Sequence, residues 1–381
     1  MHKKSDSEHS LYRAQLWMEE GQYQLALTAL QHLKTHNPEQ ERQIAYLSAW
    51  CYNLLEQWSE ARCLLLQLYP PSSFEENWND AKQNERERRA FYLLCLGNAA
   101  ISLKRIEEAS QHYTQSLKLL SERRVNLPQV RIKALHSLGL SCIMSGFYVM
   151  AIKHYEEALQ LCKNIPELED LPEIYYGLCD ANRLLGNFES AYTYGMKALE
   201  QSGNRELRNL EGRVQNLLGK ICYQMRKYHE SADHYQESLS IATLDNNQEL
   251  KMVNFTALAD LRLVEDHLEE AQRYCQLAWE VADGLNDNYF LGLMFLACGK
   301  VTLAESEQTK GEQHELLLSQ ARSFFGRAKE HLSQTQASVL LAEVYGRMAQ
   351  MFEQSGQPQD ALSYWKIAYE SLSKPIGQSL D

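Results

Sequence analysis

Small residues recur along the chain at a nearly constant interval of about 40 residues. The recurring positions are Ala26, Ala61, Ala109, Ala151, Ala191, Ser231, Ala271, Ala321 and Ala361. The steps between them are 35, 48, 42, 40, 40, 40, 50 and 40, so five of the eight lie within two residues of 40. A fixed period of this length is typical of tandem repeats, in which each unit is one supersecondary element stacked on the next. The regularity therefore favours a repeat array over a mosaic of unrelated domains.

Other residue types keep a fixed distance from this small residue, which we call the anchor. Twelve residues before the anchor stands a second small residue, at Gly97, Gly139, Cys179, Gly219, Ala259 and Ala349. Five residues before it stands a glycine in four units, at Gly21, Gly146, Gly186 and Gly356. Four residues after it stands an aromatic residue, at Tyr113, Tyr155, Tyr235, Phe325 and Trp365. Each unit thus has the same residue spacings around its anchor, which we call the repeat frame.

These spacings predict an antiparallel pair of helices in each unit. Positions 0, +4 and +7 share one face of a helix, and small residues there let two helix backbones approach closely around the aromatic ring. The glycine falls where a short turn needs a positive φ. Only 8 prolines and 18 glycines occur in 381 residues, which also favours long helices over strands.

The pattern resembles the tetratricopeptide repeat. The stretches that carry the resemblance include Leu138-Gly139, Gly146-Phe147-Tyr148, Ala151, Tyr155 and Ala158-Leu159, and further on Tyr345, Gly356, Ala361, Trp365 and Ala368. A period near 40 is similar to the long-helix variety found in kinesin light chains and in bacterial peptide sensors of the Rap and PlcR kind. The resemblance implies an all-α, right-handed superhelical solenoid of about nine antiparallel helix hairpins.

The resemblance covers residues 9–373, which we expect to form a single solenoid with insertions at about 69–89 and 306–315. Residues 1–8 and 374–381 are expected to be a flexible N-terminus and a flexible tail. The last hairpin ends near Leu372, so its outer face must be polar or be covered by another chain. We therefore expect that the chain could form a homo-oligomer through a terminal hairpin.

Composition narrows the function and the compartment. The net charge of −12 disfavours direct binding of nucleic acid, which needs clustered positive charge. Nine cysteines, with no Cys-x-x-Cys pair, argue against a disulfide framework. No secretory signal and no long apolar stretch is visible, so we expect a cytoplasmic protein without membrane contact. We expect no cofactor, no metal site and no enzymatic activity, because no catalytic or nucleotide-binding motif with the required spacing occurs.

By resemblance to the family, the first helices line an inner wall that binds peptides or partner segments. Positions near the small residue of each first helix, chiefly one after it and three before it, are expected to point inward. They select a mixed set of charged, amide and aromatic side chains: Asn98, His136, Tyr176, Asp180, Arg183, Arg213, Asn216, Lys220, Tyr223, Asp260, Lys300, Arg347 and Gln350. Such a surface can pair with the backbone and side chains of an extended peptide. The carboxylate clamp of some family members is not reproduced, because His136 and Ser137 replace its Lys and Asn.

Three functions remain open at this stage. The first is a non-catalytic scaffold that binds a protein or peptide on its inner wall. The second is a cytoplasmic receptor for a signalling peptide, acting through a partner because no DNA-binding domain precedes the repeats. The third is a Rap-like phosphatase activator, which we disfavour because repeat-like residues begin by about Leu11 and leave no room for the separate N-terminal bundle of those proteins.

Overall fold

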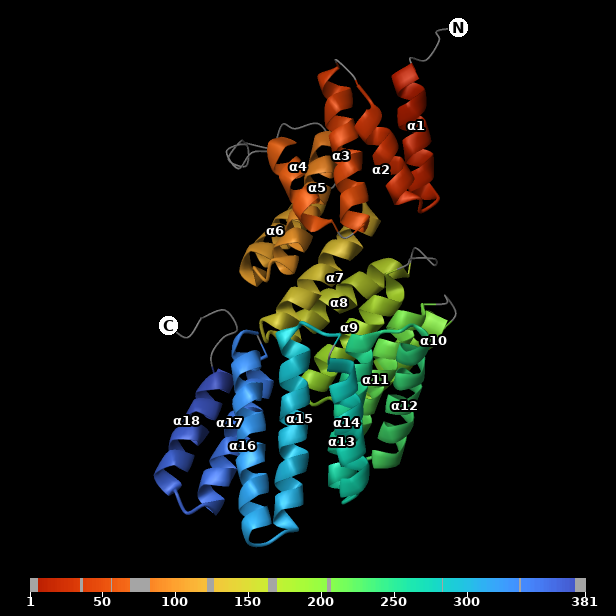
Figure 1. Cartoon of the computed structure of the whole chain (residues 1–381). Helices are drawn as coiled ribbons and strands as arrows, with labels where there is room; N and C mark the ends of the chain where they lie inside the picture. The colour runs from red at the N-terminus through yellow and green to blue at the C-terminus, as the bar shows by residue number, and fades with distance from the viewer. Residues whose placement is uncertain are drawn as a thin grey trace. The chain divides into compact units, whose positions relative to one another are not determined.

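In a computed structural model, the structure describes residues 6–34, 37–55, 57–68, 83–121, 127–163, 170–203, 207–282, 284–335 and 337–373. All regular secondary structure in these residues is helical (Figure 1). The helices are α1 (Asp6–Glu19), α2 (Tyr23–His32), α3 (Pro38–Leu54), α4 (Trp58–Leu68), α5 (Gln83–Ser102), α6 (Ile106–Leu120), α7 (Pro128–Met144), α8 (Tyr148–Cys162), α9 (Leu171–Leu184), α10 (Phe188–Gly203), α11 (Arg208–Gln224), α12 (Tyr228–Leu244), α13 (Gln248–Val264), α14 (Leu268–Ala282), α15 (Asn288–Glu307), α16 (Glu312–Ser333), α17 (Ser338–Gln354) and α18 (Pro358–Ser373).

The helices form two compact units. Unit 1 is Met1–Asp170 and holds α1 to α8, and unit 2 is Leu171–Asp381 and holds α9 to α18. Each odd-numbered helix packs against the even-numbered helix that follows it, so the described residues form nine helix hairpins. Within each unit, the second helix of one hairpin also packs on the first helix of the next, for example α12 on α13. The predicted all-α stack of about nine hairpins is therefore confirmed, while one continuous array across both units stays a prediction.

The predicted turn lies inside the hairpins. Gly21, Gly146, Gly186 and Gly356 all have positive φ, between 70° and 80°. After α7, the N–H of Gly146 donates to Ile143 and the N–H of Phe147 donates to Cys142, which is the bonding of a left-handed helix cap. The same position has positive φ in three units that lack glycine, at Lys104, Arg226 and Asp266. The repeat geometry thus imposes the left-handed turn even where the residue disfavours it.

Replacing Arg226 or Lys104 with glycine is expected to raise the free energy of unfolding by about 0.5–1 kcal/mol. A left-handed residue with a Cβ costs about 1–2 kcal/mol, and the greater freedom of glycine in the unfolded chain removes part of that gain. Both side chains are exposed, so little packing is lost. Urea denaturation followed by circular dichroism measures the change. Gly146→Ala is the reciprocal control and should destabilise, and a loss of stability in Arg226→Gly would contradict the prediction.

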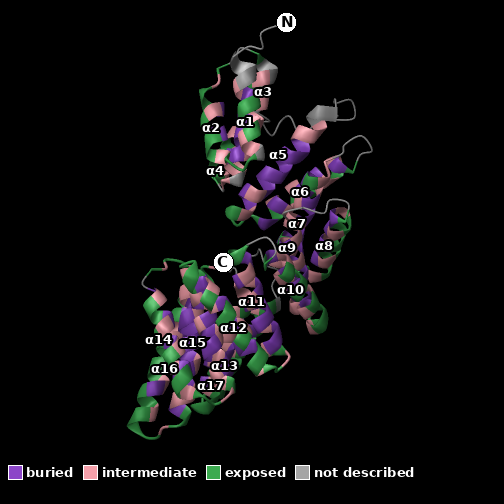
Figure 2. Ribbon diagram, turned by 90° about the vertical axis from the view of Figure 1, so that its right-hand side faces the viewer, coloured by how far each residue is buried: buried purple, intermediate pink, exposed green. Residues whose placement is uncertain are grey.

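The aromatic residue at +4 packs directly on the glycine at −12. A Cβ built on Gly97, Gly139 or Gly219 would lie 2.3, 2.8 or 2.6 Å from the ring of Tyr113, Tyr155 or Tyr235, respectively. The three rings are buried, with 1–3% exposure. Two features of the sequence frame therefore meet at one contact, which sets the distance between the two helices of a hairpin. Figure 2 shows the resulting pattern of buried and exposed residues along the helices.

The structure describes parts of the two predicted insertions and of the predicted flexible ends. Residues 83–89 form the start of α5, and 69–82 lie outside the described residues. Of residues 306–315, Ser306 and Glu307 end α15 and 312–315 begin α16, so the extra residues mostly lengthen two helices. Ser306 is buried and bonds to the carbonyl of Leu303. At the ends, α1 already begins at Asp6, while 1–5 and 374–381 lie outside the described residues.

One described helix, α15, is long and apolar enough to cross a membrane by length and composition alone. However, 56% of its apolar window is buried inside the structure, and much of α15 is coloured as buried in Figure 2. Its residues Met294, Phe295 and Ala297 belong to the largest apolar cluster of unit 2. The apolar character of α15 is therefore explained by packing between α14, α16 and α13.

Candidate functional site

Two adjoining cavities lie in unit 2. The first cavity has a volume of about 320 Å³ and is lined by Arg183, Lys220, Tyr223, Gln224, Tyr235, Val253, Thr256, Ala257, Asp260, Tyr289, Leu293, Leu340 and Glu343. The second has about 360 Å³ and is lined by Tyr223, Asp260, Leu263, Val264, Lys300, Leu303, Ala304, Glu307, Glu343 and Arg347. They share Tyr223, Asp260 and Glu343, so they adjoin, and we call the two together the hollow. Apart from Tyr235 of α12, every lining residue comes from a first helix of a hairpin.

Six of the predicted inner-wall residues meet in this hollow. They are Arg183, Lys220, Tyr223, Asp260, Lys300 and Arg347. They come from α9, α11, α13, α15 and α17, so residues more than 160 positions apart in the sequence line one site. The first helices of consecutive hairpins lie side by side, and equivalent positions therefore form a row across the unit. Whether these residues bind a partner stays a prediction.

A buried ion-pair network joins the two cavities. Lys300 is the centre, with its Nζ 2.6 Å from Asp260 Oδ2 and 3.1 Å from Glu343 Oε1. Its side chain is only 10% exposed. Burial opposes the charge, but Asp260 and Glu343 outweigh it and raise the pKa of Lys300. Burial raises the pKa of Asp260 against the lowering effect of Lys300, and Asp260 Oδ1 is buried without a hydrogen-bond partner in the described residues.

Lys220 is the cation of the first cavity that forms no direct ion pair with a described residue, although the charge of Asp180 acts on it at longer range. None of the residues that the structure describes forms a hydrogen bond or ion pair with its ammonium group. Burial, and next the charge of Arg183, lower the pKa of Lys220 to about 8. Arg183 donates from Nε at 3.0 Å and from Nη2 at 2.7 Å to Asp180 Oδ1. The first cavity therefore has one paired and one unpaired cation at its α9–α11 side.

Other predicted residues lie against neighbouring side chains, not on the open hollow. Asn216 is only 5% exposed and donates to Asn254 Oδ1 at 2.9 Å, so it lies under the inner wall, and its contact with a partner stays a prediction. The position three before the small residue faces the next first helix, which covers it. Tyr176 lies under the guanidinium of Arg213, at 4.6 Å from the ring centroid, and Arg213 pairs with Glu173 at 3.3 Å.

The remaining predicted residues belong to three separate places. In unit 1, Asn98 accepts from the hydroxyl of Tyr113 at 2.8 Å, and His136 packs against Tyr155. In α9, Asp180 is held by Arg183. At the end of unit 2, Gln350 accepts from Arg347 at 3.3 Å and lines the groove on the last hairpin. The structure therefore brings together six of the predicted residues of α9 to α17, and none of those of unit 1.

The sequence interpretation missed the lining residues Glu343, Val253 and Leu293. Glu343 and Val253 each lie 18 residues before the anchor of their repeat, Ala361 and Ala271. Leu293 lies 28 residues before Ala321, which is the equivalent position of the same row because the eighth repeat has about ten extra residues. Positions −18, −15, −11 and −8 follow spacings of three and four and so share one helix face. Only Arg213 was chosen from this row. The same periodicity that identified the helices could have found the others.

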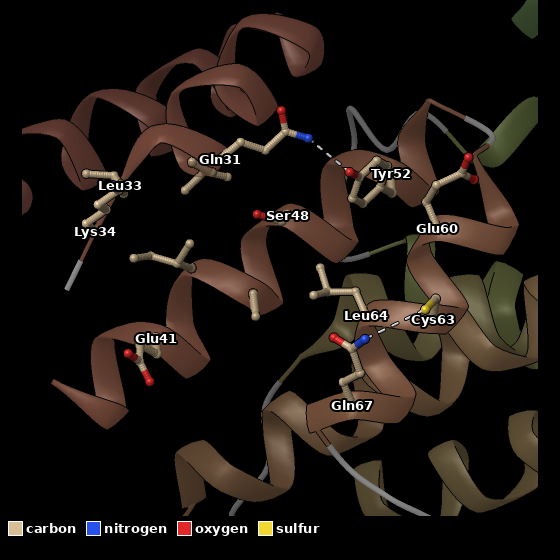
Figure 3. Close-up of a pocket in the computed structure, with 13 residues that line it drawn as sticks. Gln31, Leu33, Lys34, Glu41, Ser48, Tyr52, Glu60, Cys63, Leu64 and Gln67 are labelled. Carbon is tan, nitrogen blue, oxygen red and sulfur yellow. Dashed lines mark hydrogen bonds between the residues drawn. The ribbon is translucent and has the colours of Figure 1, made fainter. Parts of the chain in front are cut away.

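A larger hollow of about 740 Å³ lies in unit 1, between α2, α3 and α4 (Figure 3). Its lining is mostly apolar, with Leu33, Ile44 and Leu64 inside. Gln31 donates to the hydroxyl of Tyr52 at 3.0 Å and so connects α2 to α3. No predicted site residue lines this hollow, and it offers no charge pattern that identifies a ligand.

The last hairpin has an apolar groove of about 470 Å³ on α17 and α18. Trp365, Tyr369 and Leu372 line it and are 39%, 72% and 60% exposed. In earlier repeats the aromatic at the position of Trp365 is buried, as in Tyr155 and Tyr235. The sequence left two expectations for the outer face of the last hairpin. That this face is polar is therefore wrong, and that another chain covers it stays a prediction.

The described residues contain no cluster of three or more His, Cys, Asp or Glu side chains that could hold a metal ion. All nine cysteines are free, and seven are buried. Burial raises the pKa of Cys51 and of Cys222 to about 11, so both are thiols at neutral pH.

An array of helix hairpins whose first helices line a polar hollow defines a helical-repeat protein of the protein-binding kind. The chain contains tetratricopeptide repeats: the sequence pattern of the tetratricopeptide repeat family matches residues 130–202 and 170–244. The family suspected from the repeat frame is thereby confirmed. The matched residues include α8 to α11, and α11 carries Lys220 and Tyr223 of the first cavity.

Two curated relatives are similar over part of the chain. Outer dynein arm-docking complex subunit 4 of Homo sapiens is 26% identical over 191 residues, which are 48% of this chain and 27% of that protein. Tetratricopeptide repeat protein 19, mitochondrial, of Rattus norvegicus is 27% identical over 173 residues, 44% of this chain and 45% of that protein. The chain therefore spans less than half the length of the curated relatives it matches.

Solved structures of Rap proteins have a similar fold. The apo form of RapI has a TM-score of 0.71 at 12% identity, covering 98% of this chain and 99% of that chain. A Rap protein complexed with competence and sporulation factor has a TM-score of 0.66 at 12% identity, covering 97% and 98%. The likeness shows the fold alone. Because it extends over nearly the whole of both chains, lack of room for an N-terminal bundle no longer separates this chain from those proteins.

Proposed function

We propose that the chain is a non-catalytic binding protein that holds an extended segment of a partner protein, or a peptide, in the two adjoining cavities of unit 2. The observation that carries the proposal is that six of the predicted inner-wall residues line the two cavities, among them Lys220, which has no ion-pair partner in the described residues. A peptide supplies an acceptor for the ammonium of Lys220, together with side chains for the apolar lining. The expected compartment is the cytoplasm, without nucleic acid, membrane or cofactor.

A second candidate is a receptor for a signalling peptide that acts through a partner protein. It is supported by the likeness in fold to a Rap protein complexed with competence and sporulation factor. Both candidates use the same hollow, and they differ in whether the ligand is free or part of a larger protein. A second copy of the chain on the groove of the last hairpin is compatible with either.

Filling the first cavity tests the proposal. We expect Ala257→Trp to weaken binding of peptides selected from a random displayed library by at least tenfold, because Ala257 lines the cavity of about 320 Å³. The matched control is Leu244→Trp, which adds the same ring to unit 2 at a site that is 73% exposed and outside both cavities. Circular dichroism verifies that both variants fold. Peptides that bind Ala257→Trp as tightly as the wild type would place the site elsewhere.

A further inference from the structure

We propose that the first cavity binds an acidic side chain, the carboxylate of an aspartate or glutamate in the bound peptide, between Lys220 and Arg183. This inference rests on the proposed peptide-binding function and names the chemistry of its ligand. The ammonium of Lys220 has no partner among the described residues and lines the cavity. Arg183 gives Nε and Nη2 to Asp180, so its Nη1 donors are free to bind a second carboxylate.

The charges that line the cavity favour a singly charged group over a doubly charged one. Its lining contains two cations, Lys220 and Arg183, and two carboxylates, Asp260 and Glu343. Glu343 and Asp260 already share Lys300. A phosphate group carries about −1.5 to −2 charges at neutral pH and would be repelled by these carboxylates more strongly than a carboxylate is. The cavity therefore suits an acidic side chain better than a phosphorylated one.

The remaining lining predicts the neighbours of the acidic residue. Val253, Leu293 and Leu340 give the cavity an apolar side. An aliphatic side chain next to the acid would bury its surface there. The inferred ligand is thus a short acidic and aliphatic segment.

The site has a pH dependence that identifies Lys220. The titratable and charged groups that surround Lys220 are Asp180 and Arg183 of α9, Tyr223 of α11, Tyr235 of α12, Asp260 of α13, Tyr289 of α15 and Glu343 of α17. Burial raises the pKa of all three tyrosines, so they stay neutral to pH 9 and above. The pKa of Lys220 lies near 8, so Lys220 is charged below this value and loses its charge above it. Carboxylate binding should therefore weaken as the pH rises from 7 to 9.

Pools of short peptides with blocked termini test the inference. One position is fixed as Glu, Gln or phosphoserine, and the flanking positions are mixtures of Leu, Ala and Ser. We expect fluorescence polarisation to show that the Glu pool binds the full chain at least tenfold more tightly than the Gln pool. Lys220→Gln should abolish that preference. Lys220→Arg should keep it and remove its fall between pH 7 and 9, and Lys251→Gln, on α13 but outside both cavities, should behave as the wild type.

Each alternative has a distinct outcome. Equal binding of the Glu and Gln pools, lost in Ala257→Trp, would overturn the acidic side chain and leave the peptide-binding function intact. Binding of the phosphoserine pool as tight as that of the Glu pool would overturn the preference for a single charge. A pool with a free C-terminal carboxylate and no acidic side chain that binds as tightly as the Glu pool would assign the site to chain ends instead. No binding of any pool would overturn both proposals.

Discussion

Replacing Lys300 with methionine is expected to lower the free energy of unfolding by about 3 kcal/mol at neutral pH. The side chain is 10% exposed and its ammonium pairs with both Asp260 and Glu343, so its removal leaves two carboxylates without their ion-pair partner. Breaking a buried pair by removing one partner costs about 3–5 kcal/mol, and the partial exposure of Glu343 favours the lower end. Urea denaturation followed by circular dichroism measures the loss.

The size of this loss should depend on pH. Lys300 lowers the pKa of Asp260, which burial raises, so the pKa of Asp260 should rise further in the variant. A group whose pKa is raised by folding contributes stability below its unfolded pKa and loses it as the pH rises through the folded value. The penalty of Lys300→Met should therefore be larger at pH 8 than at pH 5. Adding Asp260→Asn should recover at least half of the loss.

An exposed lysine provides the matched control for Lys300. Lys366 is 76% exposed and lies 3.9 Å from Glu370 in an i,i+4 pair. Lys366→Met should change the free energy of unfolding by less than about 0.5 kcal/mol, because surface pairs contribute little. Equal effects of Lys300→Met and Lys366→Met would contradict the role given to burial. A loss in Lys300→Met that stays the same at pH 5 and pH 8 would contradict the role given to Asp260.

The sequence predicted the hairpins and their turns well because both are local. Gly146 and Gly186 mark turns that need positive φ, and the anchor frame locates the helix pairs around them. The same frame placed Arg226 and Asp266 in that turn without any glycine to reveal the backbone conformation. The spacing of the anchors does not give the length of the helices in the eighth repeat. The ten extra polar residues were predicted to form a loop, but most of them extend α15 and α16.

The site was predicted in part, because its residues depend on packing between repeats. The row of Lys220, Asp260 and Lys300 follows from the period and does line the hollow. Whether an amide such as Asn216 faces solvent or the next helix depends on the neighbour, here Asn254, which a single repeat does not show. The pairing of Lys300 and the absence of a partner for Lys220 likewise appear only when five first helices are placed together.

Replacing Gly219 with alanine is expected to destabilise the chain by about 2 kcal/mol, although alanine is the better helix former. The new Cβ would lie 2.6 Å from the ring of Tyr235, which is 3% exposed, so the two helices or the ring must shift. Overpacking of this kind costs about 1–3 kcal/mol, more than the gain of up to about 1 kcal/mol in helix propensity. Denaturation in urea, with α11 and α12 followed by hydrogen exchange, locates the loss.

Gly326 separates the effect of the contact from that of the helix. It lies inside α16 with no atom within 4 Å of a Cβ built on it, so Gly326→Ala should stabilise by about 0.5–1 kcal/mol. The double variant Gly219→Ala/Tyr235→Leu should lose at least about 1 kcal/mol less free energy of unfolding than the two single variants lose together, because both substitutions act on one contact. If Gly219→Ala were as stabilising as Gly326→Ala, the spacing of α11 and α12 would not depend on Gly219. The small residue twelve positions before the anchor would then not be needed for close packing of the two helices, and its recurrence in the repeats would need another physical explanation.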